Sequence, residues 1–178
     1  MKTPKILIVL LILLVAAVVA FLLPRCGKLA EKPIVINYET CKLAGGTILE
    51  THPPQCQYEG KKYTEDIGNE LDLYDLITIA NPRPNQKISS PLEIRGAARG
   101  SWYFEASFPI KLIDEKGNTI AQTHGEAQGD WMTKDFVPYK ATLAFKTNST
   151  KGTLILMKDN PSGDPKNDKQ LKVPVVFK

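Results

Sequence analysis

The sequence predicts an all-β sandwich domain that follows an apolar N-terminal run and a small cysteine-containing module. Three observations support this fold class: an alternating stretch at 101–114, a series of short β-prone stretches after Ile77, and an unbroken apolar run at 6–23. No stretch after Ile77 has a convincing helical period. A period of two in β-prone residues is typical of strands that bury one face, so we expect a sheet structure in this part of the chain.

The strand around which the domain is organised is expected at 101–114, where every second residue is apolar. Pro109 cannot donate to a strand ladder, so this strand is kinked there, lies at an edge, or is two strands in succession. The alternation predicts which side chains meet the core. The core face is expected to hold Trp102, Phe104, Ala106, Phe108, Ile110 and Leu112, and the outward face Tyr103, Glu105 and Ser107.

The whole region 77–178 is expected to form one immunoglobulin-like β-sandwich of about seven strands. Short strands separated by turn signals over roughly 100 residues are typical of that fold. The usual cysteine pair between the sheets is absent, so side-chain packing must hold the sheets together. The strands are expected at 77–80, 92–99, 101–114, 119–124, 139–146, 154–157 and 173–177.

The N-terminal apolar run predicts a membrane anchor. Its eighteen residues, 6–23, would span about 27 Å as a helix at about 1.5 Å per residue, near the thickness of a bilayer's hydrocarbon core. We expect residues 1–25 to be an uncleaved signal-anchor, with the C-terminal domain of a single-pass cell-membrane protein outside the cytoplasm. Cleavage after Ala20 is the alternative. Residues 26–36 then form a spacer, in which Cys26 is expected to be a free thiol.

A small module is expected at 37–64, with a two-turn helix, a short strand and a hairpin. Asn37 is the expected helix N-cap, and Gly45 the residue that ends the helix. A module of this size buries too little apolar surface to be stable alone. A disulfide between Cys41 and Cys56 is therefore expected to stabilise it, by about 3 kcal/mol in the chain-entropy model.

An acidic connector is expected between the module and the sandwich. Residues 65–76 contain five carboxylates and no basic residue, which is typical of a solvated connector or a short exposed helix. Calcium binding is the alternative, but no spacing in this segment matches a coordinating loop.

Three segments of the sandwich region carry a family resemblance: SSPLEIRGAARGSWYFEASFPIKLID, GDWMTKDFVPYKATLAF and LILMKDNPSGDPKNDKQLKVPVVF. Over 77–178 they resemble the immunoglobulin-like domain of bacterial spore-germination proteins. The resemblance implies a bacterial extracytoplasmic module without known catalytic residues, related to sporulation or germination. The matching positions are Ser90, Pro91, Leu92, Gly96, Trp102, Glu105, Phe108, Gly117, Trp131, Phe136, Val173, Pro174 and Val175.

The residues that could carry chemistry are sparse. A net charge of +4 with scattered lysines does not indicate nucleic-acid binding. The two histidines, His52 and His124, lack a nucleophile motif and a set of metal ligands. We therefore expect no catalytic residue, no metal and no cofactor. A glycosidase-type carboxylate pair could be drawn from Glu105, Asp114, Asp130 or Asp135.

Two functional classes stay open. The first is a membrane-anchored extracytoplasmic module that binds an envelope protein or a cell-wall polymer. The alternative is a cell-wall-active enzyme such as a glycoside hydrolase; we expect no enzyme. For the first class the candidate binding residues are Tyr103, Glu105, Asp130 and Trp131, which combine aromatic area with hydrogen-bond acceptors. Large aromatic side chains are mostly buried, so a place in a satellite of the core is favoured for Trp131 over a binding role.

Overall fold

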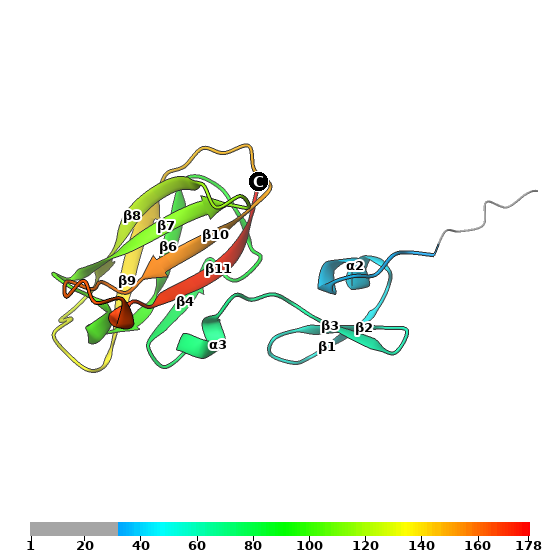
Figure 1. Cartoon of the computed structure of the whole chain (residues 1–178), viewed down its shortest axis with the longest axis horizontal. Helices are drawn as coiled ribbons and strands as arrows, with labels where there is room; N and C mark the ends of the chain where they lie inside the picture. The colour runs from blue at the N-terminus through cyan, green and yellow to red at the C-terminus, as the bar shows by residue number, and fades with distance from the viewer. Residues whose placement is uncertain (1–31) are drawn as a thin grey trace, which may run out of the picture. The chain divides into compact units, whose positions relative to one another are not determined.

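The structure is a computed structural model that describes residues 32–178 (Figure 1). Val35–Lys178 form one compact unit. The expected signal-anchor at 1–25 and Cys26 lie outside the described residues. Within 32–178, no helix is long and apolar enough to cross a membrane.

The small module has the predicted composition, one helix and three short strands. The strands form an antiparallel sheet with β2 in the centre, and the predicted hairpin is β2 and β3 with its turn at Glu59-Gly60. Its elements are α2 (Tyr38–Leu43), β1 (Thr47–Leu49), β2 (Gln55–Tyr58) and β3 (Lys61–Thr64).

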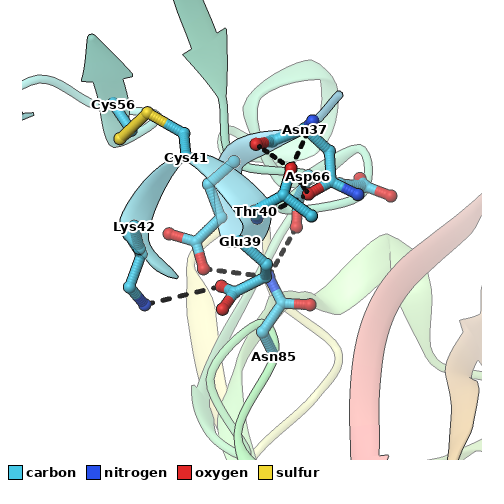
Figure 2. Close-up of polar contacts among 9 residues, drawn as sticks. Asn37, Glu39, Thr40, Cys41, Lys42, Cys56, Asp66 and Asn85 are labelled. Atoms are coloured by element: carbon cyan, nitrogen blue, oxygen red, sulfur yellow. Dashed lines mark hydrogen bonds and ion pairs between the residues drawn. A yellow bond between two sulfur atoms is a disulfide. The ribbon is translucent and has the colours of Figure 1, made fainter. Parts of the chain in front are cut away.

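Local side-chain chemistry explains where α2 begins and ends. The side chain of Asn37 accepts a hydrogen bond from the Thr40 backbone N–H at 2.9 Å, and the Thr40 hydroxyl accepts one from the Asn37 N–H at 3.0 Å. Figure 2 shows this reciprocal cap. Gly45, with a φ of 79°, follows the helix in the left-handed region that glycine tolerates. The predicted N-cap and terminating residue are both confirmed.

The predicted disulfide joins Cys41 on α2 to Cys56 on β2, and both residues are fully buried. Figure 2 shows the bond linking the helix to the central strand. The backbone of Gly46 lies against it, since a Cβ there would be 2.5 Å from the Cys41 Sγ and 2.6 Å from the Cys56 Sγ. The module's small core is thus the disulfide with Tyr38 packed beside it.

The acidic segment forms a short helix, one of its two expected structures, and is attached to the sandwich. It contains the one-turn helix α3 (Glu70–Leu73), whose Leu73 belongs to the sandwich core. Glu70 forms two hydrogen bonds with the Arg83 guanidinium, at 2.7 and 2.9 Å. Before α3, the side chain of Asn69 donates to the Gln170 carbonyl oxygen at 2.9 Å and accepts from the Lys172 N–H at 2.7 Å. Hydrogen bonds and apolar burial outweigh the repulsion among the carboxylates.

The sandwich contains eight strands, paired in the order β4-β6-β9-β8-β7-β10-β11-β5. All neighbours are antiparallel except β11 and β5. Figure 1 shows β7, β10 and β11 in front of β6 and β9. The strands are β4 (Ile77–Asn81), β5 (Lys87–Ile88), β6 (Leu92–Arg99), β7 (Ser107–Asp114), β8 (Thr119–Ala127), β9 (Phe136–Leu143), β10 (Lys151–Met157) and β11 (Gln170–Phe177).

Two features of the strand pairing are those of a sandwich. β8 pairs with β7 along most of its length and then with β9 through Glu126 and Ala127. β4 and β5 are consecutive in the chain but lie at opposite ends of the strand order. The predicted sandwich is confirmed, and the additional strand is β5, which has only two residues and therefore shows no alternation in the sequence.

The core is built from alternating faces, as the sequence predicts. In β9 every second residue from Val137 to Leu143 is buried. Phe108 is fully buried between the rings of Tyr103 and Tyr139, with centroid distances of 5.3 and 5.0 Å. Edge-to-face pairs of this kind contribute about 0.5–1.5 kcal/mol each beyond their buried area. A Cβ on Gly125 would lie 2.6 Å from the Phe108 ring, so the absence of a side chain there makes room for it.

The predicted register is wrong at Tyr103 and Phe104, whereas Trp102 is buried and Glu105 is exposed, as predicted. A short 3₁₀ helix at Gly100–Trp102 interrupts the alternation, and β7 begins only at Ser107. Tyr103 is therefore buried at 4% exposure, while Phe104 is 42% exposed. A tight turn follows, in which Phe104 and Ser107 exchange two backbone hydrogen bonds. The prediction is correct from Phe108 to Leu112.

Candidate functional site

One end of the sandwich brings together three segments, 70–76, 99–106 and 128–136, which we call the loop end. Arg99 connects them. Its Nε donates to the Asp75 carbonyl oxygen at 3.0 Å, and its guanidinium donates to the Lys134 carbonyl oxygen at 3.1 Å. The same guanidinium lies 4.4 Å from the centre of the Phe136 ring. A single side chain thus fixes the relative positions of all three segments.

Backbone contacts hold two of these segments, 99–106 and 128–136, still closer together. The Gly100 N–H donates to the Asp135 carbonyl oxygen at 3.2 Å. A Cβ on Gly100 would collide with the carbonyl oxygens of Trp131 and Thr133. The two segments therefore approach each other as closely as bare backbone allows.

Exposed apolar side chains are concentrated at the loop end. Of nine large hydrophobic side chains exposed within 32–178, five lie on its three segments. Exposed apolar patches on a domain are typical of surfaces that bind a partner. These five side chains, with their exposed fractions, are Leu71 (45%), Tyr74 (68%), Phe104 (42%), Met132 (78%) and Phe136 (37%).

All four predicted binding residues lie on segments of the loop end, and three of them reach its surface. Glu105 is exposed at the tip of the turn after Phe104. Asp130 is exposed as well, and its Oδ1 accepts a hydrogen bond from the Met132 N–H at 3.0 Å. Trp131 is half-buried and packs against the sandwich core. Part of its side chain therefore lies in a satellite of the core.

The fourth predicted residue, Tyr103, does not face outward. Its hydroxyl donates a buried hydrogen bond of 2.7 Å to the Val137 carbonyl oxygen. Burial raises the pKa of Tyr103 to about 12. The side chain therefore supports the loop end from beneath and offers no surface to a ligand.

The turn that carries Glu105 is strained. Glu105 and Ala106 have φ angles of 49° and 61°, in the left-handed region that residues other than glycine, asparagine and aspartate avoid. Such a conformation costs about 1–3 kcal/mol per residue and persists only where the surrounding structure imposes it. Its consequence here is that Glu105 and Phe104 project from the tip of the turn.

Glu105 also lines a polar hollow beside the loop end. The hollow measures about 530 Å³ and includes Ser107, His124 and Glu126. A second hollow of about 380 Å³ shares His124 and Glu126 and continues toward Lys140 and Thr142 on β9. The place of His124 and Glu126 in this hollow was not predicted from the sequence. The available signal was their two-residue spacing on β8, but the strand register is needed to place them beside Glu105.

Asp114, one of the carboxylates considered for glycoside hydrolysis, has a structural role. It accepts hydrogen bonds from the Asn118 side chain at 2.9 Å and from the backbone N–H groups of Asn118 and Lys116 at 2.8 and 2.9 Å. The Asn118 side chain is the main cause that lowers the pKa of Asp114 below its ordinary value. Asp114 therefore stabilises the turn between β7 and β8. Within 32–178, no group of three or more histidine, cysteine or acidic side chains is arranged to hold a metal ion.

Residues 76–164 match the model of the Gmad2 family, described as the immunoglobulin-like domain of bacterial spore germination. The chain belongs to this family. The resemblance stated from the sequence is thereby confirmed for residues 77–164, and β11, which lies beyond the matched range, pairs with β10 in the same sheet. Comparisons with curated proteins and with solved structures found no match.

Proposed function

We propose that this chain is a membrane-anchored binding and scaffolding module of the bacterial cell envelope, active in the context of sporulation or germination. The observation that carries the proposal is the loop end, where a domain of the Gmad2 family presents five exposed apolar side chains on a rigid base. Soluble domains rarely expose such clusters unless a partner covers them.

Two further features support an extracytoplasmic location. Cys41 and Cys56 form a disulfide, and disulfides persist mainly in oxidising compartments such as the exterior of the bacterial cell. The apolar run at 6–23 has the length of a membrane-spanning helix, which supports anchoring of the domain at the membrane. The partner in this proposal is an envelope protein or a cell-wall polymer.

Retention of envelope material by the immobilised full-length chain tests the proposal. The chain, in detergent, is incubated with solubilised membrane proteins and separately with isolated cell wall from the host bacterium. Met132→Ser changes the most exposed apolar side chain of the loop end, and Leu43→Ser is the matched control on α2, where Leu43 is 87% exposed. We expect both variants to melt like the parent and only Met132→Ser to retain less material. Absence of saturable retention by the parent would remove the proposal.

The second candidate is a cell-wall-active enzyme, because Glu105, His124 and Glu126 line one hollow. Two carboxylates across a cleft are the minimum that glycoside hydrolysis requires. The test is release of reducing sugar from purified cell wall. Hydrolysis by the parent that is lost in Glu126→Gln would establish the enzyme, and no release by either protein would eliminate it.

A further inference from the structure

We propose that the loop end binds a basic, apolar protein segment, that is, a stretch of a partner protein in which lysine or arginine accompanies aromatic or aliphatic side chains. This inference deepens the proposed function and rests on it. Two independent properties of the loop end lead to it: its local charge and its exposed rings.

The charge of the loop end is opposite to that of the whole chain. Its three segments contain six carboxylates and two cations, a net charge of −4, whereas the chain carries +4. Glu70 is held by Arg83, and the other five carboxylates are on exposed residues. The exposed ones are Asp72, Asp75, Glu105, Asp130 and Asp135. Exposed carboxylates of this kind attract and orient a cationic partner and repel an acidic one.

The exposed rings favour the same partner. The guanidinium of Arg99 already lies over one of them, 4.4 Å from the centre of the Phe136 ring. Tyr74 and Phe104 offer further ring surface at 68% and 42% exposure. A lysine or arginine on a ring face contributes about 0.5–1 kcal/mol at an exposed site, and more when water is removed. The flexible side chain of Met132 adapts to apolar groups of different shapes.

The loop end is also organised before any partner binds. Arg99 links its segments, Gly100 lets two of them meet through bare backbone, and the buried Tyr103 hydroxyl bonds to Val137 beneath them. A surface fixed in this way loses little conformational entropy on binding. Aromatic side chains accompanied by charged residues are typical of protein recognition sites.

Binding of defined peptides to the full-length chain in detergent micelles tests the inference. Three fluorescent peptides of equal length are compared: one of lysine and phenylalanine, one of glutamate and phenylalanine, and one of lysine and serine. Binding to empty micelles is subtracted. The loop-end variant is Glu105→Lys with Asp135→Lys, and its control is Glu50→Lys with Glu115→Lys, which makes the same change of charge at exposed positions elsewhere.

We expect saturable binding of the lysine–phenylalanine peptide in preference to the other two. The loop-end variant should bind the lysine–phenylalanine peptide about tenfold more weakly than the parent. The control variant should bind it within about twofold of the parent, because exposed charges act mainly over short range. Met132→Ser should also weaken binding, whereas Leu43→Ser should not.

The other outcomes overturn the inference. Equal binding of the glutamate–phenylalanine peptide, or equal losses in both double variants, would show that charge does not select the partner. If the parent self-associates in sedimentation and the loop-end variant does not, the partner is a second copy of the chain. If the parent binds cell wall saturably and the loop-end variant does not, the partner is a glycan. If the peptides fail but Met132→Ser still loses envelope material, the proposed function stands and only the partner's chemistry is wrong.

Discussion

The hydroxyl of Tyr103 donates a 2.7 Å hydrogen bond to the carbonyl oxygen of Val137, which ties the segment after β6 to the first half of β9. The next residue in the chain, Phe104, is 42% exposed. Two adjacent aromatic residues thus have opposite roles: one supports the loop end, and the other forms part of its surface.

Substitutions at these two positions should therefore differ in their effect on stability. Tyr103→Ala removes a buried ring and should lower the free energy of unfolding by about 3–5 kcal/mol. Tyr103→Phe leaves the Val137 oxygen without its donor and should cost about 1–3 kcal/mol. Phe104→Ala should cost less than about 1 kcal/mol, as is usual for exposed positions. Urea unfolding measures all three free energies. A larger loss for Phe104→Ala than for Tyr103→Ala would show that Phe104 is the buried ring, as alternation predicts.

The buried phenols predict a loss of stability at alkaline pH. Burial raises the pKa of Tyr103 from 10.0 to about 12, and burial also raises the pKa of Tyr139. The folded state therefore favours the neutral phenol. The contribution of the buried Tyr103 phenol to the free energy of unfolding is complete below pH 10 and is lost as the pH rises toward 12. The difference in unfolding free energy between the parent and Tyr103→Phe should shrink over that interval. A difference that stays constant with pH would contradict the burial of this hydroxyl.

The packing of Gly46 against the disulfide gives a prediction about its formation. Gly46→Ala would place a Cβ 2.5 and 2.6 Å from the two sulfur atoms, so Cys41 and Cys56 should be bonded in only part of the variant protein. Thiol titration under denaturing conditions should find one free thiol in the parent without reductant and three with it, and a higher value without reductant in the variant. Gly129→Ala is the control, because a Cβ there meets nothing closer than 3.9 Å. Identical thiol counts in both variants would contradict this packing.

Asn69 attaches the acidic segment to the edge of β11, so its removal should loosen that edge. Asn69→Ala breaks the bonds to the Gln170 carbonyl oxygen and the Lys172 N–H and should cost about 1–3 kcal/mol. Hydrogen exchange at the Lys172 amide should become faster. Asn148→Ala, at an exposed position in the β9–β10 loop, serves as the control and should leave this exchange rate unchanged.

Local patterns in the sequence were sufficient to predict most of the elements. Alternation located β6 at 92–99 with its correct bounds, and it identified the buried face of β9, although the strand begins at Phe136 and not at Tyr139. The Asn37 cap and the cysteine spacing identified α2 and the disulfide. In each case the signal lies within a few residues of the feature it predicts.

The register at Tyr103 and Phe104 and the loop end could not be predicted in this way. Glu105 and Ala106 adopt left-handed backbone without the asparagine or glycine that normally announces a two-residue turn. The contacts that assemble the loop end, such as those of Arg99 and Gly100, join segments about 25–35 residues apart in the chain. No local pattern encodes such contacts, so Phe104 was expected in the core and Tyr103 on the surface.

Hydrogen–deuterium exchange of the full-length chain, with and without saturating envelope material, tests the binding role of the loop end most directly. We predict slower exchange on binding in 99–106 and 128–136, and no change at the β7–β8 turn around Gly117. Protection confined to the small module at 37–64, or to the hollow around His124 with none at the loop end, would contradict the account.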